Sequence, residues 1–207
     1  PNGRKVDPRL KDITLAHLMR HQGGWHRDKS IDPLFHSIEI ATALGKRPPA
    51  THNDIIRFMK GWPLDFKPGT RYAYSNLGYC LLGRVIEQTT GSDYETYMKE
   101  AFLKPLGITR MRSGKTLQRA EEEVAYYPKG QMVGIAVTGP HIGAKVPRPY
   151  GAWSIEAMDS LGAWIASASD LVRFGSAVDR FEQSKILNAQ SIKTMLKKPL
   201  TPLPYQP

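Results

Sequence analysis

The sequence is short of cysteine and of long hydrophobic runs, and each shortage excludes a class of protein. Cys80 is the single cysteine among 207 residues, which excludes an internal disulfide and a zinc site built from a cysteine cluster. No stretch approaches the roughly 18 consecutive apolar residues of a transmembrane helix. The first ten residues are polar and charged, so we expect no signal peptide within this chain. None of this decides the compartment.

What the sequence does contain is typical of a globular protein. Hydrophobic residues make up 41% of the chain, which is enough to bury a core. The net charge of +10 is spread evenly along the chain, without an aromatic-glycine RNA motif or zinc-finger spacing. We therefore expect a solvated basic surface rather than a nucleic-acid interface. Because no repeat, low-complexity tract or linker is present, residues 1–207 are predicted to form one continuous unit.

Apolar periodicity predicts a mostly helical chain with a few strands. The expected helices cover residues 13–21 (capped by Asp12), 36–44, 54–60 (capped by Thr51 or Asn53), 77–88, 94–102 (capped by Ser92 or Asp93), 171–179 (capped by Ser169 or Asp170) and 189–196 (capped by Asn188). Residues 108–158 are rich in glycine and proline, and strands are expected near 123–127 and 130–138. The strongest helix is 77–88, with Gly91 after its last turn.

The segment 67–76, directly before that helix, carries the best candidates for chemistry. Tyr74 and Asn76 lie two residues apart around an extended-to-helix turn, so both side chains can face one cleft. A phenol can act as a general base when nearby cations lower its pKa of about 10. An asparagine amide can hold both a substrate carbonyl and a lysine. Each residue alone also has a purely structural interpretation. Tyr74 could be a half-buried strand residue, and Asn76 or Ser75 could be a helix N-cap.

Four stretches of the chain carry sequence motifs. One is Pro68-Gly69-Thr70, followed after three residues by Tyr74-Ser75-Asn76 and a Gly-Tyr-x-Leu-Leu-Gly helix, and the others are residues 12–24, 97–111 and 161–174. Together they resemble the serine β-lactamase and penicillin-binding-protein superfamily, in the order expected for its class C β-lactamase-like branch of esterases and D-peptidases. Residues 12–24 are similar to the "Ile-Thr-x-x-x-Leu-Leu-x-His-x-Ser-Gly" helix of that branch, residues 97–111 to its "Pro-Leu-Gly-Met" segment, and residues 161–174 to "Gly-Gly-Leu-x-Ser-Thr-Ala-x-Asp-Leu-x-Arg-Phe".

The resemblance implies acyl transfer on an amide or ester. In this family the serine of a Ser-x-x-Lys motif attacks the carbonyl, and the lysine and the tyrosine of Tyr-x-Asn move the proton. A strand with Lys-Thr-Gly or His-x-Gly lines the oxyanion hole. Carried over by position, Tyr74 would be the general base and Asn76 the anchor for substrate and lysine. The resemblance implies no cofactor and no metal, a peptide or ester substrate rather than a β-lactam, and a parent protein that is exported to the periplasm.

The sequence departs from the family pattern at the nucleophile. No serine in the chain has a lysine three residues later. His141-Ile142-Gly143 matches the His-x-Gly motif, but it precedes residues 161–174, whereas in the family this motif follows that segment. Lys115-Thr116 does not form a Lys-Thr-Gly motif, because leucine follows it. We therefore expect an internal fragment of a β-lactamase-like domain: an α+β, mostly helical lobe without most of the flanking sheet. Such a chain should be inactive by itself and should self-associate through an exposed apolar face.

The same residues also allow alternative hypotheses on function. The rival is a β-lactamase-like binding or scaffold protein without catalysis, and a Ser-x-x-Lys motif in the flanking coding sequence would argue against it. A third reading is a basic nucleic-acid-binding domain, which binding measurements over a range of salt concentrations would test. His17 and His21, four apart on an expected helix, could touch one metal ion, but no His-Glu-x-x-His pattern accompanies them.

Overall fold

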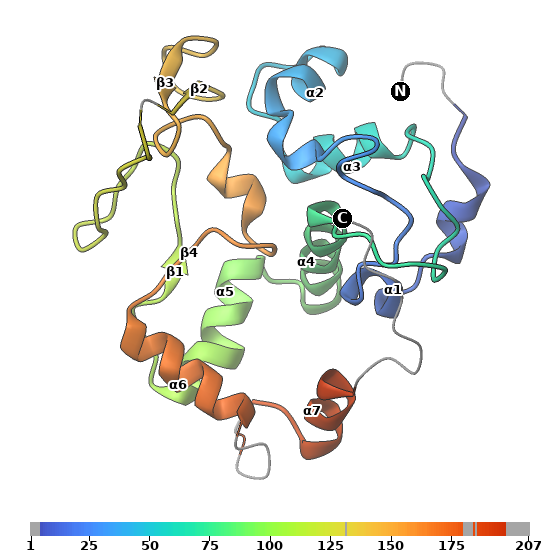
Figure 1. Ribbon diagram of the computed structural model, residues 1–207. Helices are drawn as coiled ribbons and strands as arrows, with labels where there is room; N and C mark the ends of the chain where they lie inside the picture. The colour runs from blue at the N-terminus through green and yellow to red at the C-terminus, as the bar shows by residue number, and fades with distance from the viewer. Residues whose placement is uncertain (1–4, 131, 180–183, 185, 198–207) are drawn as a thin grey trace. The chain divides into compact units, whose positions relative to one another are not determined.

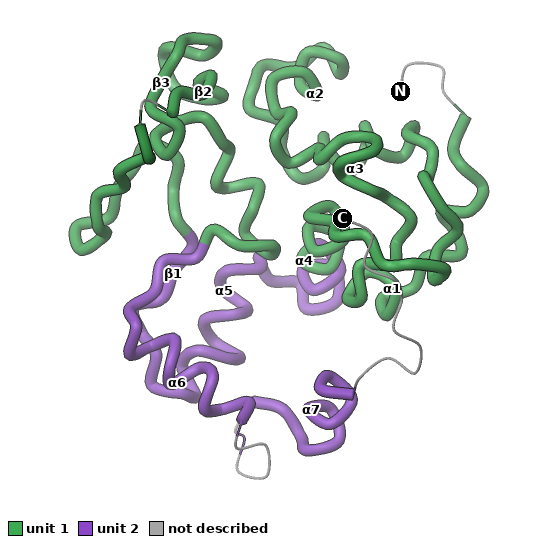
Figure 2. The backbone as a smooth tube through the Cα atoms, viewed as in Figure 1, with its two compact units in different colours: residues 1–83, 114–163, 203–207 green, residues 84–113, 164–202 purple. Residues whose placement is uncertain are grey.

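The computed structural model describes residues 5–130, 132–179, 184 and 186–197 (Figure 1). Contacts divide the chain into two compact units (Figure 2). Unit 1 comprises residues 1–83, 114–163 and 203–207, and unit 2 comprises residues 84–113 and 164–202. Helices predominate in the described chain, and each unit has one short antiparallel strand pair. Among the described residues, no helix is both long and apolar enough to cross a bilayer.

Unit 1 is built from short helices joined by turns. Its helical elements are η1 (Pro8–Asp12), α1 (Leu15–Met19), η2 (Pro33–Phe35), α2 (Ser37–Ala43), α3 (His52–Met59), the first half of α4 (Asn76–Thr90) and η5 (Ile155–Met158). Its strands β2 (Val133–Ile135) and β3 (Lys145–Pro147) pair antiparallel, with Gly134 opposite Val146.

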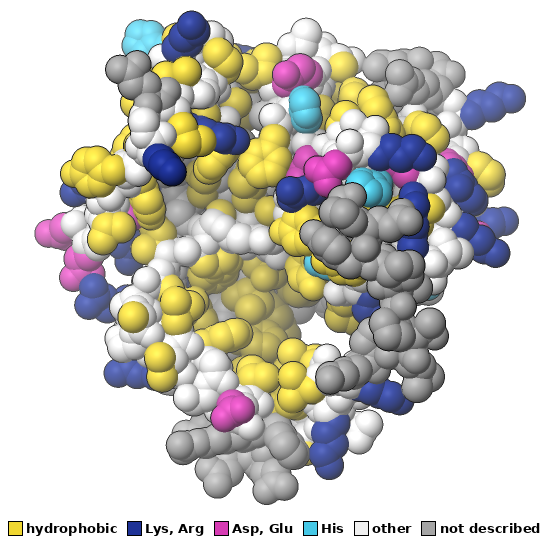
Figure 3. Space-filling model, in the orientation of Figure 1, with side chains coloured by type: hydrophobic (Ala, Val, Ile, Leu, Met, Phe, Trp, Pro, Cys, Tyr) yellow, Lys and Arg dark blue, Asp and Glu magenta, His cyan; other side chains and the backbone are white. Residues whose placement is uncertain are grey.

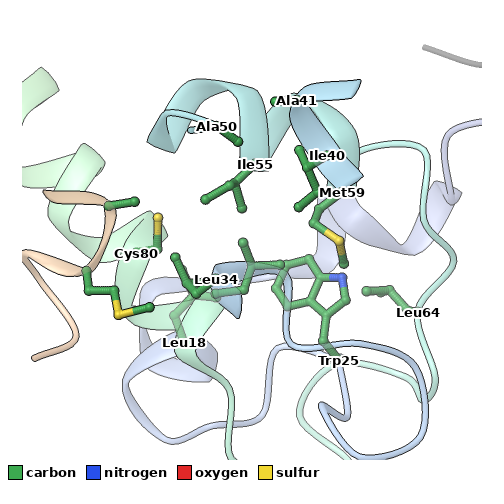
Figure 4. Close-up of a cluster of buried hydrophobic side chains, with 13 residues drawn as sticks. Leu18, Trp25, Leu34, Ile40, Ala41, Ala50, Ile55, Met59, Leu64 and Cys80 are labelled. Atoms are coloured by element: carbon green, nitrogen blue, oxygen red, sulfur yellow. The ribbon is translucent and has the colours of Figure 1, made fainter. Parts of the chain in front are cut away.

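The core of unit 1 joins segments that are far apart in the sequence. Side chains from α1, η2, α2, α3 and α4 meet there, each 6% exposed or less: Leu18, Leu34, Ile40, Ile55 and Leu77. Figure 4 shows that side chains of this cluster converge in the space between the helices. Because burying one large aliphatic side chain stabilises a fold by roughly 1.5–3 kcal/mol, this cluster fixes how the short helices pack.

Unit 2 has a smaller core, formed by residues of the segment 103–111 and by residues of the segment 164–174. Its elements are α5 (Tyr94–Met98), the π-helical turn η3 (Lys99–Leu103), η4 (Lys104–Leu106), β1 (Arg112–Ser113), β4 (Trp164–Ile165), α6 (Ala168–Asp179) and α7 (Ala189–Leu196). Strands β1 and β4 pair antiparallel. Leu103, Ile108 and Met111 are buried, and Trp164 and Phe174 pack against them.

The strongly periodic helices were predicted correctly. The predicted helix 77–88 is confirmed as α4, and Gly91 ends it with a φ of 70°. The predicted helices near 36–44 and 54–60 are α2 and α3, the latter capped by Thr51. Asn188 caps α7 as expected, because its side chain accepts a hydrogen bond from the Ser191 N–H at 2.8 Å.

Three local predictions were wrong. The helix expected over 13–21 is shorter, because Thr14 rather than Asp12 forms the N-cap and a 3-10 helix already ends at Asp12. The helix expected over 94–102 is α-helical only to Met98 and continues as the π-helical turn. The helix expected over 171–179 begins at Ala168, because the Ser167 hydroxyl accepts from the Asp170 N–H at 3.1 Å.

The expected strands were placed only in part. Residues 123–127 form no strand, and their side chains reach the surface, with Tyr127 89% exposed. The strand expected within 130–138 exists as β2, but its partner is β3. Neither β1 nor β4 was predicted, since a strand of two residues is too short to produce an alternating pattern.

Candidate functional site

A turn in unit 1 brings the predicted segment to the start of α4. Gly69 adopts a φ of 79°, in the left-handed region that favours glycine, and its N–H donates to the Gln22 carbonyl at 2.9 Å. The Ala73 N–H donates to the His21 carbonyl at 2.8 Å. These two bonds hold the segment along the residues that follow α1. Tyr74 therefore has a fixed place beside the first turn of α4.

The structure brings the two predicted site residues together. The Tyr74 hydroxyl donates to Asn76 Oδ1 at 2.9 Å. Asn76 is the first residue of α4 and is 6% exposed, whereas Tyr74 is 42% exposed. A buried amide thus holds the hydroxyl of a side chain that solvent and a substrate can reach. Ser75, between them, is buried, and its hydroxyl accepts from the Gly78 N–H at 3.2 Å, as in a capped first turn.

Asp32 is the third member of this cluster, and sequence reasoning missed it. The Asn76 side-chain amide donates to Asp32 Oδ2 at 2.7 Å. The same carboxylate caps η2, where the Leu34 N–H lies 3.4 Å from Oδ1. Burial raises the pKa of the Asp32 carboxyl, although the hydrogen bond from Asn76 and the Arg27 charge oppose that shift. Asp32 and Asn76 are 44 residues apart, and no motif links them.

His21 supports the same segment by bonding its backbone. Its Nδ1 atom accepts from the Ser75 N–H at 3.2 Å, which fixes a neutral ring with the proton on the other nitrogen. The ring packs among three tyrosine rings, with centroid distances of 4.7 Å to Tyr74, 5.0 Å to Tyr79 and 5.5 Å to Tyr72. Burial lowers the pKa of His21. The imidazole therefore acts as an acceptor and a packing surface.

A cation completes the cluster. The Arg27 guanidinium lies 5.0 Å from the centre of the Tyr74 ring, a distance that permits a cation–π contact. It also pairs with Asp28 at 3.4 Å. Tyr74, Asn76, Asp32, His21 and Arg27 all belong to unit 1, and together they are called the Tyr74 cluster below.

The geometry does not support the hypothesis that His17 and His21 bind one metal ion from one helical face. His21 lies beyond α1 and has a φ of 54°, so His17 and His21 do not share one helical face. His17 Nδ1 instead accepts from the Thr14 N–H at 3.3 Å and completes a capping box. His141 lies exposed in a turn. Thr116, which follows Lys115, donates its hydroxyl to Glu156 at 2.6 Å and so anchors a loop.

Comparison with known proteins agrees with the fold and with the family resemblance. A family model described as Beta-lactamase matches residues 4–206. A protein of Escherichia coli K12 named "Putative D-alanyl-D-alanine carboxypeptidase" is 30% identical over 97 residues, which are 47% of this chain and 21% of that protein. The matched segment thus spans about a fifth of that relative.

Solved structures with lower sequence identity have the same fold. A D-stereospecific amidohydrolase from Streptomyces sp. superposes with a TM-score of 0.62 at 21% identity, over 89% of this chain and 51% of that one. An octameric penicillin-binding protein homologue from Pyrococcus abyssi gives a TM-score of 0.53 at 25% identity, over 96% and 44%. The chain therefore spans about half of each of these proteins, and its fold is the helical lobe of the β-lactamase/transpeptidase-like fold. With the family model covering nearly the whole sequence, the chain belongs to the Beta-lactamase family of serine hydrolases.

Proposed function

We propose that this chain provides the Tyr-x-Asn part of a serine-hydrolase site that transfers an acyl group from an amide or ester. Tyr74 is the general base, and Asn76 holds the substrate carbonyl and the lysine that accompanies the nucleophile. One observation carries the proposal. In a chain of the Beta-lactamase family, the buried amide of Asn76 at the start of α4 accepts a hydrogen bond from the hydroxyl of the exposed Tyr74.

The proton balance assigns each group one task. A serine hydroxyl attacks the carbonyl carbon, and its proton passes to the phenolate oxygen of Tyr74. As the tetrahedral intermediate breaks its C–N or C–O bond, Tyr74 returns that proton to the leaving amine or alkoxide. Water then attacks the acyl-serine by the same route in reverse. Over one cycle the enzyme is unchanged, and the substrate has gained one water.

The nucleophile of this reaction is not among the 207 residues, because no serine is followed by a lysine at the third position. We infer that the chain alone does not catalyse the reaction. In the structure the Tyr74 hydroxyl donates a hydrogen bond to Asn76 Oδ1. A neighbouring lysine ammonium would stabilise the phenolate that a general base requires.

The substrate class follows from the family rather than from the cluster. The names of the relatives include a carboxypeptidase and an amidohydrolase, which act on amide bonds. We propose a peptide or ester substrate for the protein that contains this lobe, and we propose that residues 1–207 form part of one β-lactamase-like domain.

The alternative is a β-lactamase-like scaffold that binds without catalysis, which the absence of Ser-x-x-Lys from these 207 residues favours. The flanking coding sequence separates the two. A Ser-x-x-Lys motif upstream, in frame with this segment, supports the hydrolase. Its absence supports the scaffold.

A covalent probe tests the proposal on the chain itself. The purified chain is exposed to a fluorophosphonate, and its intact mass is measured. We expect an unmodified mass, because no activated serine is present. An adduct on one serine that Tyr74→Phe abolishes would overturn the inference of inactivity. Tyr97→Phe is the matched control, since it removes a tyrosine hydroxyl from unit 2.

We also propose that the chain self-associates. Apolar side chains of α6 and α7 reach the surface of unit 2, with Leu171, Val172, Met195 and Leu196 between 55% and 67% exposed. Figure 3 shows hydrophobic side chains at the surface over α6. The octameric homologue from Pyrococcus abyssi indicates that this fold can assemble.

A further inference from the structure

The side-chain amide of Asn76 lies between a hydrogen-bond acceptor, Asp32, and a hydrogen-bond donor, Tyr74. On one side its Nδ2 donates to Asp32 at 2.7 Å, and on the other its Oδ1 accepts from Tyr74 at 2.9 Å. Asn76 is 6% exposed, so water does not compete freely for either end. We propose that Asp32 is a positioning residue, whose carboxylate fixes the Asn76 amide with its carbonyl oxygen toward the Tyr74 hydroxyl.

The orientation of the amide depends on which of the three groups can donate a hydrogen bond and which can only accept one. An ionised carboxylate only accepts hydrogen bonds, so the end of the Asn76 amide that faces Asp32 must be the NH2 group. The other end is then the carbonyl oxygen, and a carbonyl can only accept. The Tyr74 hydroxyl therefore must donate to it. Without the carboxylate, the oxygen and nitrogen of the amide could exchange places by rotation about the Cβ–Cγ bond, because the two ends have nearly the same size.

This orientation matters to the reaction proposed above, and the inference rests on that proposal. With its proton engaged by Asn76, the Tyr74 oxygen keeps its lone pairs available to other groups. The Asn76 NH2 group has two hydrogens, and Asp32 takes one of them. The second is left for a substrate carbonyl. An amide rotated by half a turn would present a carbonyl oxygen to that carbonyl and would repel it.

A purely structural role for Asp32 is the competing explanation. Its carboxylate caps η2, but that contact is 3.4 Å long, against 2.7 Å for the contact with Asn76. Both contacts go to the same carboxylate, but only the contact with Asn76 has the length of about 2.7–2.9 Å that is typical of a strong hydrogen bond to a charged acceptor. Asparagine caps helices as well as aspartate does, so Asp32→Asn retains the cap and the size while removing the charge.

The test follows the Asn76 side-chain NH2 by NMR in the full 207-residue chain labelled with 15N-asparagine. Variants Asp32→Asn and Asp32→Ala are compared with Asp93→Ala, which removes another N-cap carboxylate, that of α5 in unit 2. We expect exchange of the Asn76 side-chain protons with water to rise by about tenfold or more in Asp32→Ala, by less in Asp32→Asn, and not at all in Asp93→Ala.

Unchanged exchange in Asp32→Ala would overturn the proposal, as would an equal effect of Asp93→Ala. If Asp32→Ala fails to fold, the comparison is made with Asp32→Asn, for which unchanged exchange has the same meaning. The measurement needs no turnover, so it can fail while the hydrolase proposal stands. Conversely, a failed hydrolase proposal would leave the orientation of the amide intact.

Discussion

His21 makes the candidate site sensitive to acid because its ring must stay neutral to accept from Ser75. Burial lowers the pKa of His21 in the folded chain, while in the unfolded chain it has the ordinary value of about 6.5. Protonation therefore favours unfolding. The stability that the neutral ring contributes is fully present above about pH 6.5 and is lost as the pH falls below that value.

The variant His21→Asn tests this at the position itself. Asparagine tolerates the φ of 54°, and its Oδ1 can accept from the Ser75 N–H without titrating. At pH 8 we expect the variant to be less stable by about 1–2 kcal/mol, since it loses the ring packing. That difference should shrink as the pH falls to 5, because only the wild type loses the neutral ring.

Urea unfolding of both proteins at several pH values measures the difference. His141→Asn, at an exposed histidine, is the control and should follow the wild type throughout. A gap between His21→Asn and the wild type that stays constant from pH 8 to 5 would contradict the prediction.

The same residues show what sequence could and could not reveal. Tyr74 and Asn76 were predictable because they are two residues apart and belong to a motif with a fixed spacing. Their supports were not. Asp32 bonds Asn76 across 44 residues and His21 bonds Ser75 across 54, and such pairings arise only when the chain folds back on itself. His21 was predicted to lie on a helix, but its positive φ of 54° cannot be inferred from the residue type.

At the scale of elements, the turn before Tyr74 depends on a close contact as well as on backbone freedom. A Cβ atom at Gly69 would lie 2.7 Å from His17 Nε2, whereas one at Gly91 would meet nothing within 4 Å. Both glycines have a φ between 70° and 79°. An alanine costs roughly 1–2 kcal/mol at either position from its conformation alone.

We expect Gly69→Ala to cost about 1 kcal/mol more than Gly91→Ala, because His17 must move and so weakens its capping box with Thr14. Thermal unfolding of the two single variants measures this excess. Adding His17→Ala to Gly69→Ala should remove most of it, since the clash is then gone. Equal costs for the two alanines, or no rescue in the double variant, would show that the contact is unimportant.

Element prediction succeeded where local signals were sufficient. Thr51 and Asn188 cap their helices through their own side chains, and the apolar stripe of α4 is long enough to be recognised. Strands failed because their pairing is not local. Residues 123–127 include strand-forming side chains but pair with no strand in the part of the chain that the structure describes, while β1 and β4 are two residues long and separated by about 50 residues.

At the scale of the whole molecule, the surface of α6 should govern association. Leu171 is 55% exposed and Val172 is 67% exposed, side by side on the first turns of this helix. If these side chains become buried between copies of the chain, each contributes on the order of 1 kcal/mol. The double variant Leu171→Glu/Val172→Glu should therefore weaken association by at least about tenfold.

Sedimentation equilibrium over a range of concentrations measures the effect. The control is Val124→Glu, which adds a charge at an exposed valine of unit 1 and should leave association unchanged. The control gains one acidic charge and the α6 variant two on a strongly basic chain, so the control accounts for part of the reduced general repulsion between copies. A chain that is monomeric at every concentration would refute self-association. An association that Val124→Glu weakens as much as the α6 variant would place the contact elsewhere on the surface.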